Sequence, residues 1–394
     1  MIISNQQGSL IMMNFKETIQ FIDVLRNTGA NLVPCLLGHT GIGKTELVEQ
    51  YAASRNMDCI VIHVAQLEPS DFIGLYQIDE DGRTANCPPN WLPYRNDSTA
   101  KKKADNKLAL EKIVKGVINP NGGILFLDEI NRGHEDIRQS LYQLINKREI
   151  GTYALPEGYT IVAAANPSNS YETYEFDKAL TNRFAWVKFQ PEIKESFEYL
   201  TKKHGSNPIL DWLKTDKDLL DLGDDDFEID DMLLSPRMTE NAILLYNEIT
   251  QENKTIKRKF LEALIQKEKV QAFLSYEEEM QHLNFKEVLQ GKKQEKVKSL
   301  IRDKRLDVLS TITIHLAEYF DTYSFDGEGD DIIKKGKEKD AVKNLTDFML
   351  AAPAELNTVF VDACKCYSRT DSIFHQTYFR TKLKEKLNNY KKLF

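Results

Sequence analysis

The sequence predicts an α/β fold for its first half, a parallel β-sheet covered by helices on both faces, followed by a second half made of helices. Short apolar runs, suited to burial on both faces of a sheet, alternate with helical patterns as far as Pro191. A glycine-rich loop follows the first run and opens a helical pattern. The five runs are Leu32–Leu37, Cys59–Val64, Gly123–Asp128, Thr160–Ala165 and Ala185–Phe189.

Helical spacing of apolar residues also predicts helices before and after this sheet. The spacing from Phe15 to Leu25 indicates a lead-in helix, and Gly29 is suited to end it. After Pro191 the pattern is helical and charged. We expect a disordered stretch at 1–13, an α/β domain at 14–191, a small helical lid at 192–265 and a helical C-terminal region at 266–394.

Composition and charge exclude several classes of protein. The formal net charge of −8 over 394 residues argues against a whole-surface grip on nucleic acid, but it leaves open a local basic lining in the pore of an oligomer. We find no apolar run long enough to span a bilayer and no secretory signal, so no membrane partner is expected. Five scattered cysteines indicate reduced thiols and a cytoplasmic location. The acidic runs Asp224–Asp226 and Asp326–Asp331 lack the spacing of a calcium loop.

The glycine-rich loop has the spacing of a phosphate cradle. Its glycines let the backbone curl so that N–H groups point at an anion, and the helix behind it adds partial positive charge. Lys44 would reach the β- and γ-phosphates, and the Thr45 hydroxyl would bind Mg²⁺. The loop consists of Gly38, His39, Thr40, Gly41, Ile42, Gly43, Lys44 and Thr45.

Two carboxylates end the third apolar run. Asp128 can hold Mg²⁺, directly or through water, and Glu129 can polarise an attacking water as the catalytic base. Core packing explains them poorly, because unpaired buried charges are costly. Downstream of a phosphate loop, the pair predicts a nucleotide-hydrolysing site.

Three further residues are candidates for the reaction. Asn166 ends the fourth run, where an amide can sense the γ-phosphate and position water, although a turn residue before proline is also common. Arg183 precedes the fifth run and Arg237 follows Ser235-Pro236. A guanidinium aimed at a γ-phosphate neutralises charge in the transition state, but an isolated arginine is usually a surface charge.

Four motifs, in this order along the chain, resemble the MoxR-type AAA+ ATPases, and within them the CbbQ/NorQ-like branch. The resemblance extends to Ser235-Pro236-Arg237 and more faintly to the helical tail. It implies an AAA+ P-loop αβα sandwich with a helical lid. The motifs are Gly38–Thr45, Leu125–Arg132, Ala163–Pro167 and Leu180–Phe184.

The resemblance also implies roles for single residues. Asn166 matches sensor 1, Arg183 the arginine finger that acts on the neighbouring subunit's nucleotide, and Arg237 sensor 2 of the lid. Arg132 matches an arginine at subunit interfaces, with a less defined role. Thr181-Asn182 departs from the family pattern, which weakens any statement about the finger's neighbours.

Two insertions of the family have counterparts here, and the second of them is a hairpin. One interrupts the second helix, and the segment from Asp71 to Pro93 resembles it. The other precedes sensor 1, and Glu149–Thr160 resembles that. The segment Lys101–Lys103 has no family counterpart that we can place.

These observations predict an ATPase with ATP and Mg²⁺ as cofactors. We expect a ring oligomer, a hexamer by resemblance, that remodels a protein client as a chaperone-like motor with a von Willebrand factor A-domain partner. One alternative is a McrB-like motor of a nucleic-acid or defence system that uses GTP. The acidic charge and the lack of a basic, aromatic-bearing domain argue against nucleic acid. A slow nucleotide-gated switch is a second alternative.

Overall fold

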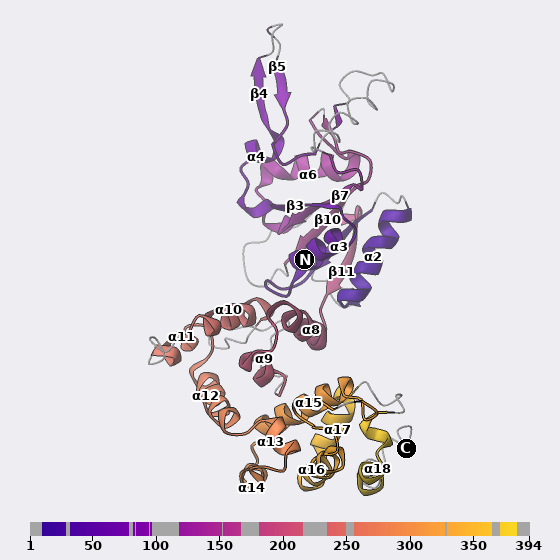
Figure 1. Cartoon of the computed structure of the whole chain (residues 1–394). Helices are drawn as coiled ribbons and strands as arrows, with labels where there is room; N and C mark the ends of the chain where they lie inside the picture. Colours follow the sequence, from indigo (N-terminus) through magenta and orange to yellow (C-terminus); the bar gives the residue numbers. More distant parts are fainter. Residues whose placement is uncertain are drawn as a thin grey trace. The chain divides into compact units, whose positions relative to one another are not determined.

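A computed structural model describes the chain as two compact units (Figure 1). The first unit comprises residues 1–196 with 221–228 and 235–237, and the second contains the remainder to residue 394. The predicted division at residue 265 stays a prediction, since both of its sides fall in the second unit. The described residues are 10–28, 32–78, 82, 84–93, 95–96, 118–151, 153–166, 181–215, 235–249, 256–327, 329–364 and 371–383. Gly29, Lys101–Lys103, Pro167 and Asp224–Asp226 lie outside them.

The first unit is built on a six-stranded sheet in which every pair of neighbours is parallel. The order across the sheet is β1-β11-β2-β10-β7-β3, and all five predicted strands are present. A parallel order with crossovers places helices on both faces, which confirms the predicted fold class. The strands are β2 (Val33–Leu37), β3 (Asp58–His63), β7 (Gly123–Asp128), β10 (Tyr159–Ala165) and β11 (Phe184–Phe189).

The sixth strand was not predicted. Met12 and Met13 form β1 and pair in parallel with Lys188 and Phe189 of β11. The expectation of disorder for residues 1–13 is therefore wrong for these two residues. Their backbone groups complete the edge of the sheet, and the lead-in helix α2 (Phe15–Thr28) follows directly.

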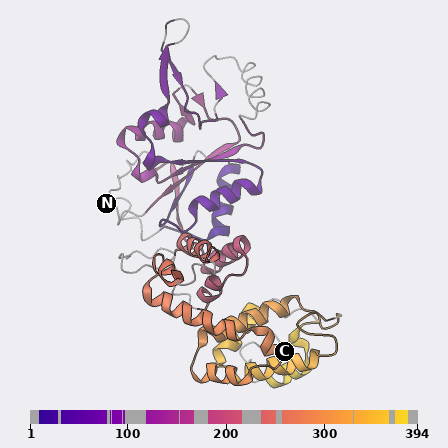
Figure 2. The same ribbon diagram turned by 60° about the vertical axis from the view of Figure 1, so that its left-hand side comes forward.

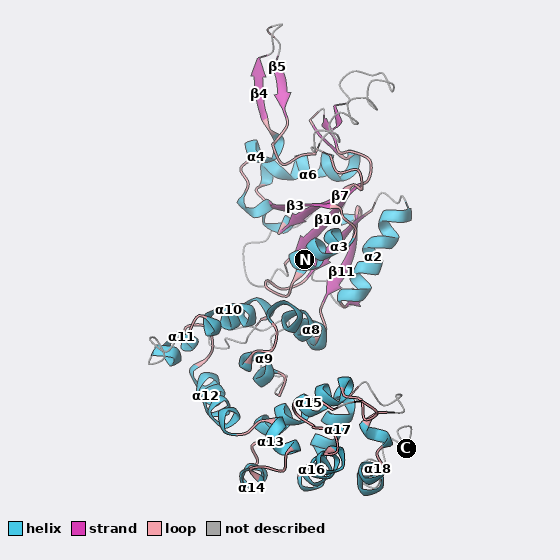
Figure 3. Cartoon of the chain, in the orientation of Figure 1, coloured by secondary structure: helices cyan, strands magenta, loops and turns pink. Residues whose placement is uncertain are grey.

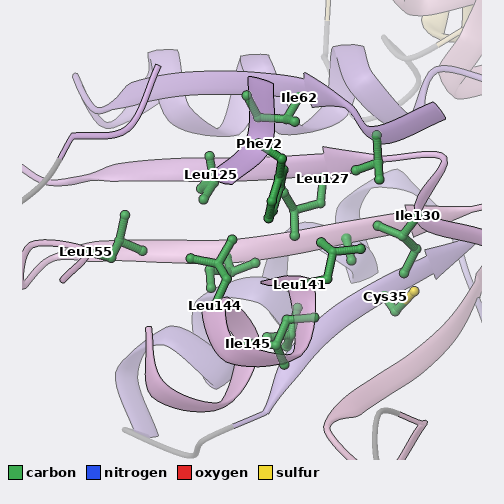
Figure 4. Close-up of a cluster of buried hydrophobic side chains, with 14 of the residues drawn as sticks. Cys35, Ile62, Phe72, Leu125, Leu127, Ile130, Leu141, Leu144, Ile145 and Leu155 are labelled. Carbon is green, nitrogen blue, oxygen red and sulfur yellow. The ribbon is translucent and has the colours of Figure 1, made fainter. Parts of the chain in front are cut away.

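Helices cover both faces of this sheet, and alternating side chains of each strand point to opposite sides. On one face, Ile124 and Phe126 of β7 pack with residues of α2 and of α3 (Lys44–Ser54). On the other face, Leu125 and Leu127 join a cluster with α6 (Glu135–Lys147), as Figure 4 shows. The strands are thus apolar on both faces because both faces are covered.

Between β3 and β7 the chain forms a hairpin that projects from this unit in two views (Figures 1 and 2). A short 3₁₀ turn η2 (Val64–Gln66) leads to α4 (Pro69–Ile73), then to antiparallel β4 (Leu75–Ile78) and β5 (Thr84–Cys87). The side chain of Phe72 in α4 is fully buried, 5.5 Å from the ring of Trp91. All four residues of β4 are exposed, and the described contact that anchors the hairpin lies at its base.

A second, smaller sheet precedes β10. It consists of β6 (Arg95–Asn96), β8 (Glu149–Ile150) and β9 (Tyr153–Ala154), all antiparallel. The segments predicted as the two insertions thus both contain antiparallel strands, although only the second was predicted to be a hairpin.

The described part of the second unit is helical, apart from one isolated bridge between Gly329 and Lys334 (Figure 3). An ion pair of Lys257 in α11 (Lys257–Glu262) with Glu277 joins that helix to α12 (Lys267–His282). The Glu277 carboxylate also accepts from the hydroxyl of Tyr246 in α10 (Pro236–Asn247) at 2.5 Å. Among the described helices, none has the length and apolar character needed to cross a bilayer. The helices from Pro191 onward are α8 (Ile193–His204), α9 (Pro208–Leu213), α10 (Pro236–Asn247), α11 (Lys257–Glu262), α12 (Lys267–His282), α13 (Phe285–Leu289), α14 (Gln294–Arg302), α15 (Leu306–Thr322), α16 (Glu338–Ala351), α17 (Ala354–Ala363) and α18 (Thr377–Leu383).

The turn before β7 sets a sharp test of this fold. Gly122 has a φ of +79°, and a Cβ there would lie 2.2 Å from the carbonyl oxygen of Gly158. We expect Gly122→Ala to destabilise the first unit by about 3 kcal/mol or more, through backbone strain plus overpacking. Urea unfolding measures this.

Gly82 supplies the matched control, because it has a similar φ of +75° but no atom within 4 Å of an added Cβ. Gly82→Ala should cost about 1 kcal/mol from the left-handed backbone alone. Equal losses for the two variants would contradict the close approach of Gly122 to Gly158.

Candidate functional site

The carboxyl ends of four neighbouring parallel strands meet at one edge of the sheet. The glycine loop follows β2, Asp128 ends β7, and Asn166 follows β10. His63, which ends β3, pairs in register with Asp128. Parallel sheets bind ligands at this edge, so the fold itself brings the predicted polar residues together.

The loop from Gly38 to Gly43 is curled as the sequence predicts. Gly41 and Gly43 have φ values of +86° and +98°, a region that suits glycine. A Cβ on Gly38 would lie 2.9 Å from the carbonyl oxygen of Phe189 in β11. The loop thus depends on glycine at three positions, and α3 begins at Lys44 directly behind it.

Lys44 is buried across this loop, with 7% of its surface exposed. Its ammonium donates to the carbonyl oxygens of Gly38 at 2.5 Å and His39 at 2.8 Å, and to Asn166 Oδ1 at 2.8 Å. Burial lowers the pKa of Lys44 to about 8, against the raising effect of Asp128 and Glu129. Because three acceptors use its three N–H groups, an incoming phosphate would have to replace some of them.

Asp128 and Thr45 form the pair expected to hold magnesium. The Thr45 hydroxyl donates to Asp128 Oδ2 at 3.2 Å, and His63 Nδ1 lies 3.6 Å from the same oxygen. Hydroxyl and carboxylate oxygens fit the ligand preference of Mg²⁺. Within the described residues no group of three or more His, Cys, Asp and Glu could hold a metal. A magnesium ion here would therefore take its other ligands from phosphate and water.

Glu129 stands on a strained turn. Its φ and ψ of 53° and 41° are left-handed, which is uncommon for a residue other than glycine, asparagine or aspartate. Its Oε1 accepts from Asn166 Nδ2 at 3.1 Å and from Arg132 at 3.1 Å. Such strain is concentrated at functional sites because it fixes where a side chain points. Here it places the Glu129 carboxylate beside Asn166.

Asn131 was not singled out from the sequence, yet it connects two strand ends. Its side chain is 2% exposed and donates from Nδ2 to the Asn166 carbonyl oxygen at 2.8 Å. Its Oδ1 accepts from the Asn166 backbone N–H at 3.3 Å. The sequence carries no signal for this role, because the burial of Asn131 and the partners that a buried amide needs arise only from the fold. Asn131 thus fixes Asn166 against the Glu129 turn.

Arg183 does not join this cluster. It precedes β11, and its carbonyl oxygen accepts from the N–H of Val33 at the start of β2. The glycine loop lies at the other end of β2, about 13 Å away at about 3.3 Å per strand residue. The Arg183 backbone is therefore at the opposite edge of the sheet from the loop of its own chain.

Ser235 and Arg237 belong to the same compact unit as the glycine loop. The backbone N–H of Arg237 donates to the Gly41 carbonyl oxygen at 3.3 Å, and its side chain is exposed. The charge of Arg237 also contributes to lowering the Lys44 pKa. Arg237 thus lies next to the loop, and its role as sensor 2 stays a prediction from the family resemblance.

The arrangement suits phosphoryl chemistry. It combines curled glycines at a helix N-terminus, a buried ammonium, a hydroxyl–carboxylate pair and a second carboxylate held by an amide. Groups of these kinds can bind an anion and a divalent cation and can orient a water molecule, which are the requirements of phosphoryl transfer to water.

Comparison with known proteins agrees with this. Residues 34–184 match the family model of the AAA domain, dynein-related subfamily, and this region has the AAA+ P-loop fold. The narrower placement in the CbbQ/NorQ-like branch of MoxR-type proteins stays a prediction. A search of curated proteins finds no match. Among solved structures, a RuvB mutant from Thermotoga maritima is similar at 16% identity and a TM-score of 0.34, over 64% of this chain and 68% of that one.

The Asn131 contacts predict a measurable loss of stability. Asn131→Leu leaves the Asn166 N–H and carbonyl buried without partners, at a cost of about 2–4 kcal/mol. Asn131→Asp keeps the acceptor but loses the donor, so its loss should be intermediate. Urea unfolding measures the free energy of unfolding of both variants. If Asn131→Leu were as stable as the parent, Asn131 would not hold Asn166 in place through these two hydrogen bonds.

Proposed function

We propose that this chain hydrolyses ATP and acts as a chaperone-like AAA+ remodelling motor in a ring. One observation carries the proposal: the groups that we expect to bind and hydrolyse a triphosphate gather at one edge of the sheet, while the Arg183 backbone lies at the opposite edge. A finger that cannot reach its own chain's phosphates must act on a neighbour's. Hydrolysis then requires an assembly in which one subunit's Arg183 faces the next subunit's Lys44.

Each residue has a defined task in the proposed reaction. Lys44 gives up its loop carbonyl acceptors and binds the β- and γ-phosphates with the loop N–H groups. Thr45 and Asp128 would hold magnesium, which neutralises phosphate charge. Glu129 Oε2, the oxygen not engaged by Asn166 and Arg132, accepts a proton from the attacking water. Asn166 contacts both Lys44 and Glu129, so it can report the presence of the γ-phosphate to the base.

Hydrolysis at a shared interface would do mechanical work. ATP joins two subunits through the γ-phosphate and Arg183, and loss of the phosphate loosens that contact. The exposed hairpin of β4 and β5 is a part of the first unit that could deliver the movement to a protein client. A hexameric ring and a von Willebrand factor A-domain partner complete the proposal, on the family resemblance alone.

A glutamine at position 129 tests the base. Glu129→Gln keeps an oxygen for the Asn166 amide but cannot take a proton, so turnover should fall by about 10²–10⁴-fold while nucleotide binding persists. Phosphate release and equilibrium binding of a fluorescent ATP analogue measure the two quantities. Lys44→Ala is the control that should lose binding. Hydrolysis by Glu129→Gln at the parental rate would overturn the assignment.

Mixed assemblies test the shared site. Arg183→Ala and Lys44→Ala subunits should each be inactive, but a mixture should regain part of the activity, because a Lys44→Ala subunit can lend its Arg183 to an intact loop. Phosphate release across mixing ratios measures the gain, with each variant alone as control. Absence of rescue at every ratio would refute a finger acting between subunits.

The same assay separates the alternatives. Competition by GTP together with stimulation by DNA would favour a motor of a nucleic-acid system. Very slow turnover in a preassembled ring would favour a nucleotide-gated switch.

A further inference from the structure

The turn that carries Glu129 ends on Gly133, and the neighbourhood of this glycine is unusually tight. A Cβ on Gly133 would lie 2.6 Å from Cγ1 of Val64, with the next atoms at 3.8 Å. Gly133 has a φ of −64° and a ψ of 143°, a conformation open to any residue. The backbone conformation therefore does not restrict position 133 to glycine. The restriction comes from the Val64 methyl group, which leaves no space for a Cβ.

Val64 has little freedom to move away. Its side chain is fully buried in the core cluster that includes Leu127 and Ile130. A β-branched side chain has few alternative rotamers, and a close-packed interior resists extra volume. Anything added at Gly133 must therefore displace the turn that carries Glu129.

Val64 also begins the segment that leads to the hairpin. It directly follows His63, is the first residue of η2, and is followed by α4. That helix is fixed by Trp91, whose Nε1 donates to the Asp71 carbonyl oxygen at 3.0 Å. The Trp91 ring also packs against the buried Phe72 ring in a tilted arrangement, with centroids 5.5 Å apart. One contact thus joins the Glu129 turn to the base of β4 and β5.

We infer that Val64 is a positioning residue for Glu129. Its methyl group packs on Gly133, sets the place of the turn on which Glu129 stands, and ties this turn to the root of the hairpin. The inference rests on the proposed function, because the position of Glu129 matters to turnover only if Glu129 activates water.

Four proteins test it: the parent, Gly133→Ala, Val64→Ala and the double variant. An added methyl group should shift the Glu129 turn, and shifts near 1 Å cost up to about 100-fold in rate, so we expect kcat of Gly133→Ala to fall by about 10- to 100-fold. The dissociation constant for nucleotide should stay within about twofold, because Gly38–Thr45 is untouched. Val64→Ala alone should lower kcat only a few-fold, because the rest of the core cluster still supports the turn. Since it removes the clashing methyl, the double variant should recover to within a few-fold of Val64→Ala and clearly above Gly133→Ala.

Recovery of kcat in the double variant is the informative result, because a variant that is merely destabilised would not regain activity when a second core residue is truncated. Gly133→Ala at the parental kcat, or a double variant as slow as Gly133→Ala, would overturn the inference. Gly327→Ala in the second unit, which also lacks a left-handed φ, is the control and should leave kcat unchanged.

A second measurement does not depend on turnover. Hydrogen exchange of residues 64–78 is compared with and without a non-hydrolysable ATP analogue. We expect a nucleotide-dependent change in the parent, its loss in Gly133→Ala and its return in the double variant. If the parent binds nucleotide but never hydrolyses it, the proposed function fails, and this exchange pattern alone decides the inference. An identical response in parent and Gly133→Ala would refute it.

Discussion

Parallel hydrogen bonding between β2, β10, β7 and β3 is the constraint on which the site depends. Because all four strands run the same way, everything that follows a strand emerges at one edge. Thr45, Asp128 and Asn166 are separated by many residues in the chain, and only this pairing places them within hydrogen-bonding distance of one another or of Lys44. The same direction puts Arg183, which precedes a strand, at the other edge.

The charged groups of Lys44 and Glu129 are stabilised by a small network of hydrogen bonds within the protein rather than by water alone. Asn166 lies at its centre, accepting from Lys44, donating to Glu129 and fixed in place by Asn131. Burying an ammonium is unfavourable without such partners, and the lowered pKa of Lys44 records that cost. A phosphate brings negative charge that removes the cost. Binding energy would thus come partly from relief of an existing penalty.

The sequence was most informative where a pattern is repetitive or a spacing is fixed. The five strands could be predicted because their apolar runs reflect burial on both faces, and the glycine loop because φ values near +90° restrict residue type. Met12 and Met13 were missed because a two-residue strand has no period to detect. Asn131 and the Val64–Gly133 contact were missed because they depend on tertiary proximity. The roles of Arg183 and Arg237 stay predictions from resemblance.

The left-handed backbone of Glu129 has a consequence for anyone who engineers this chain. Glycine, and to a lesser degree asparagine, fits that conformation better than glutamate, at a difference of about 1–2 kcal/mol. A search guided by local backbone preference would therefore recommend replacing this residue. The more heat-resistant protein obtained in this way would lack the Glu129 carboxylate. Thermal stability and the proposed turnover therefore favour different residues at position 129.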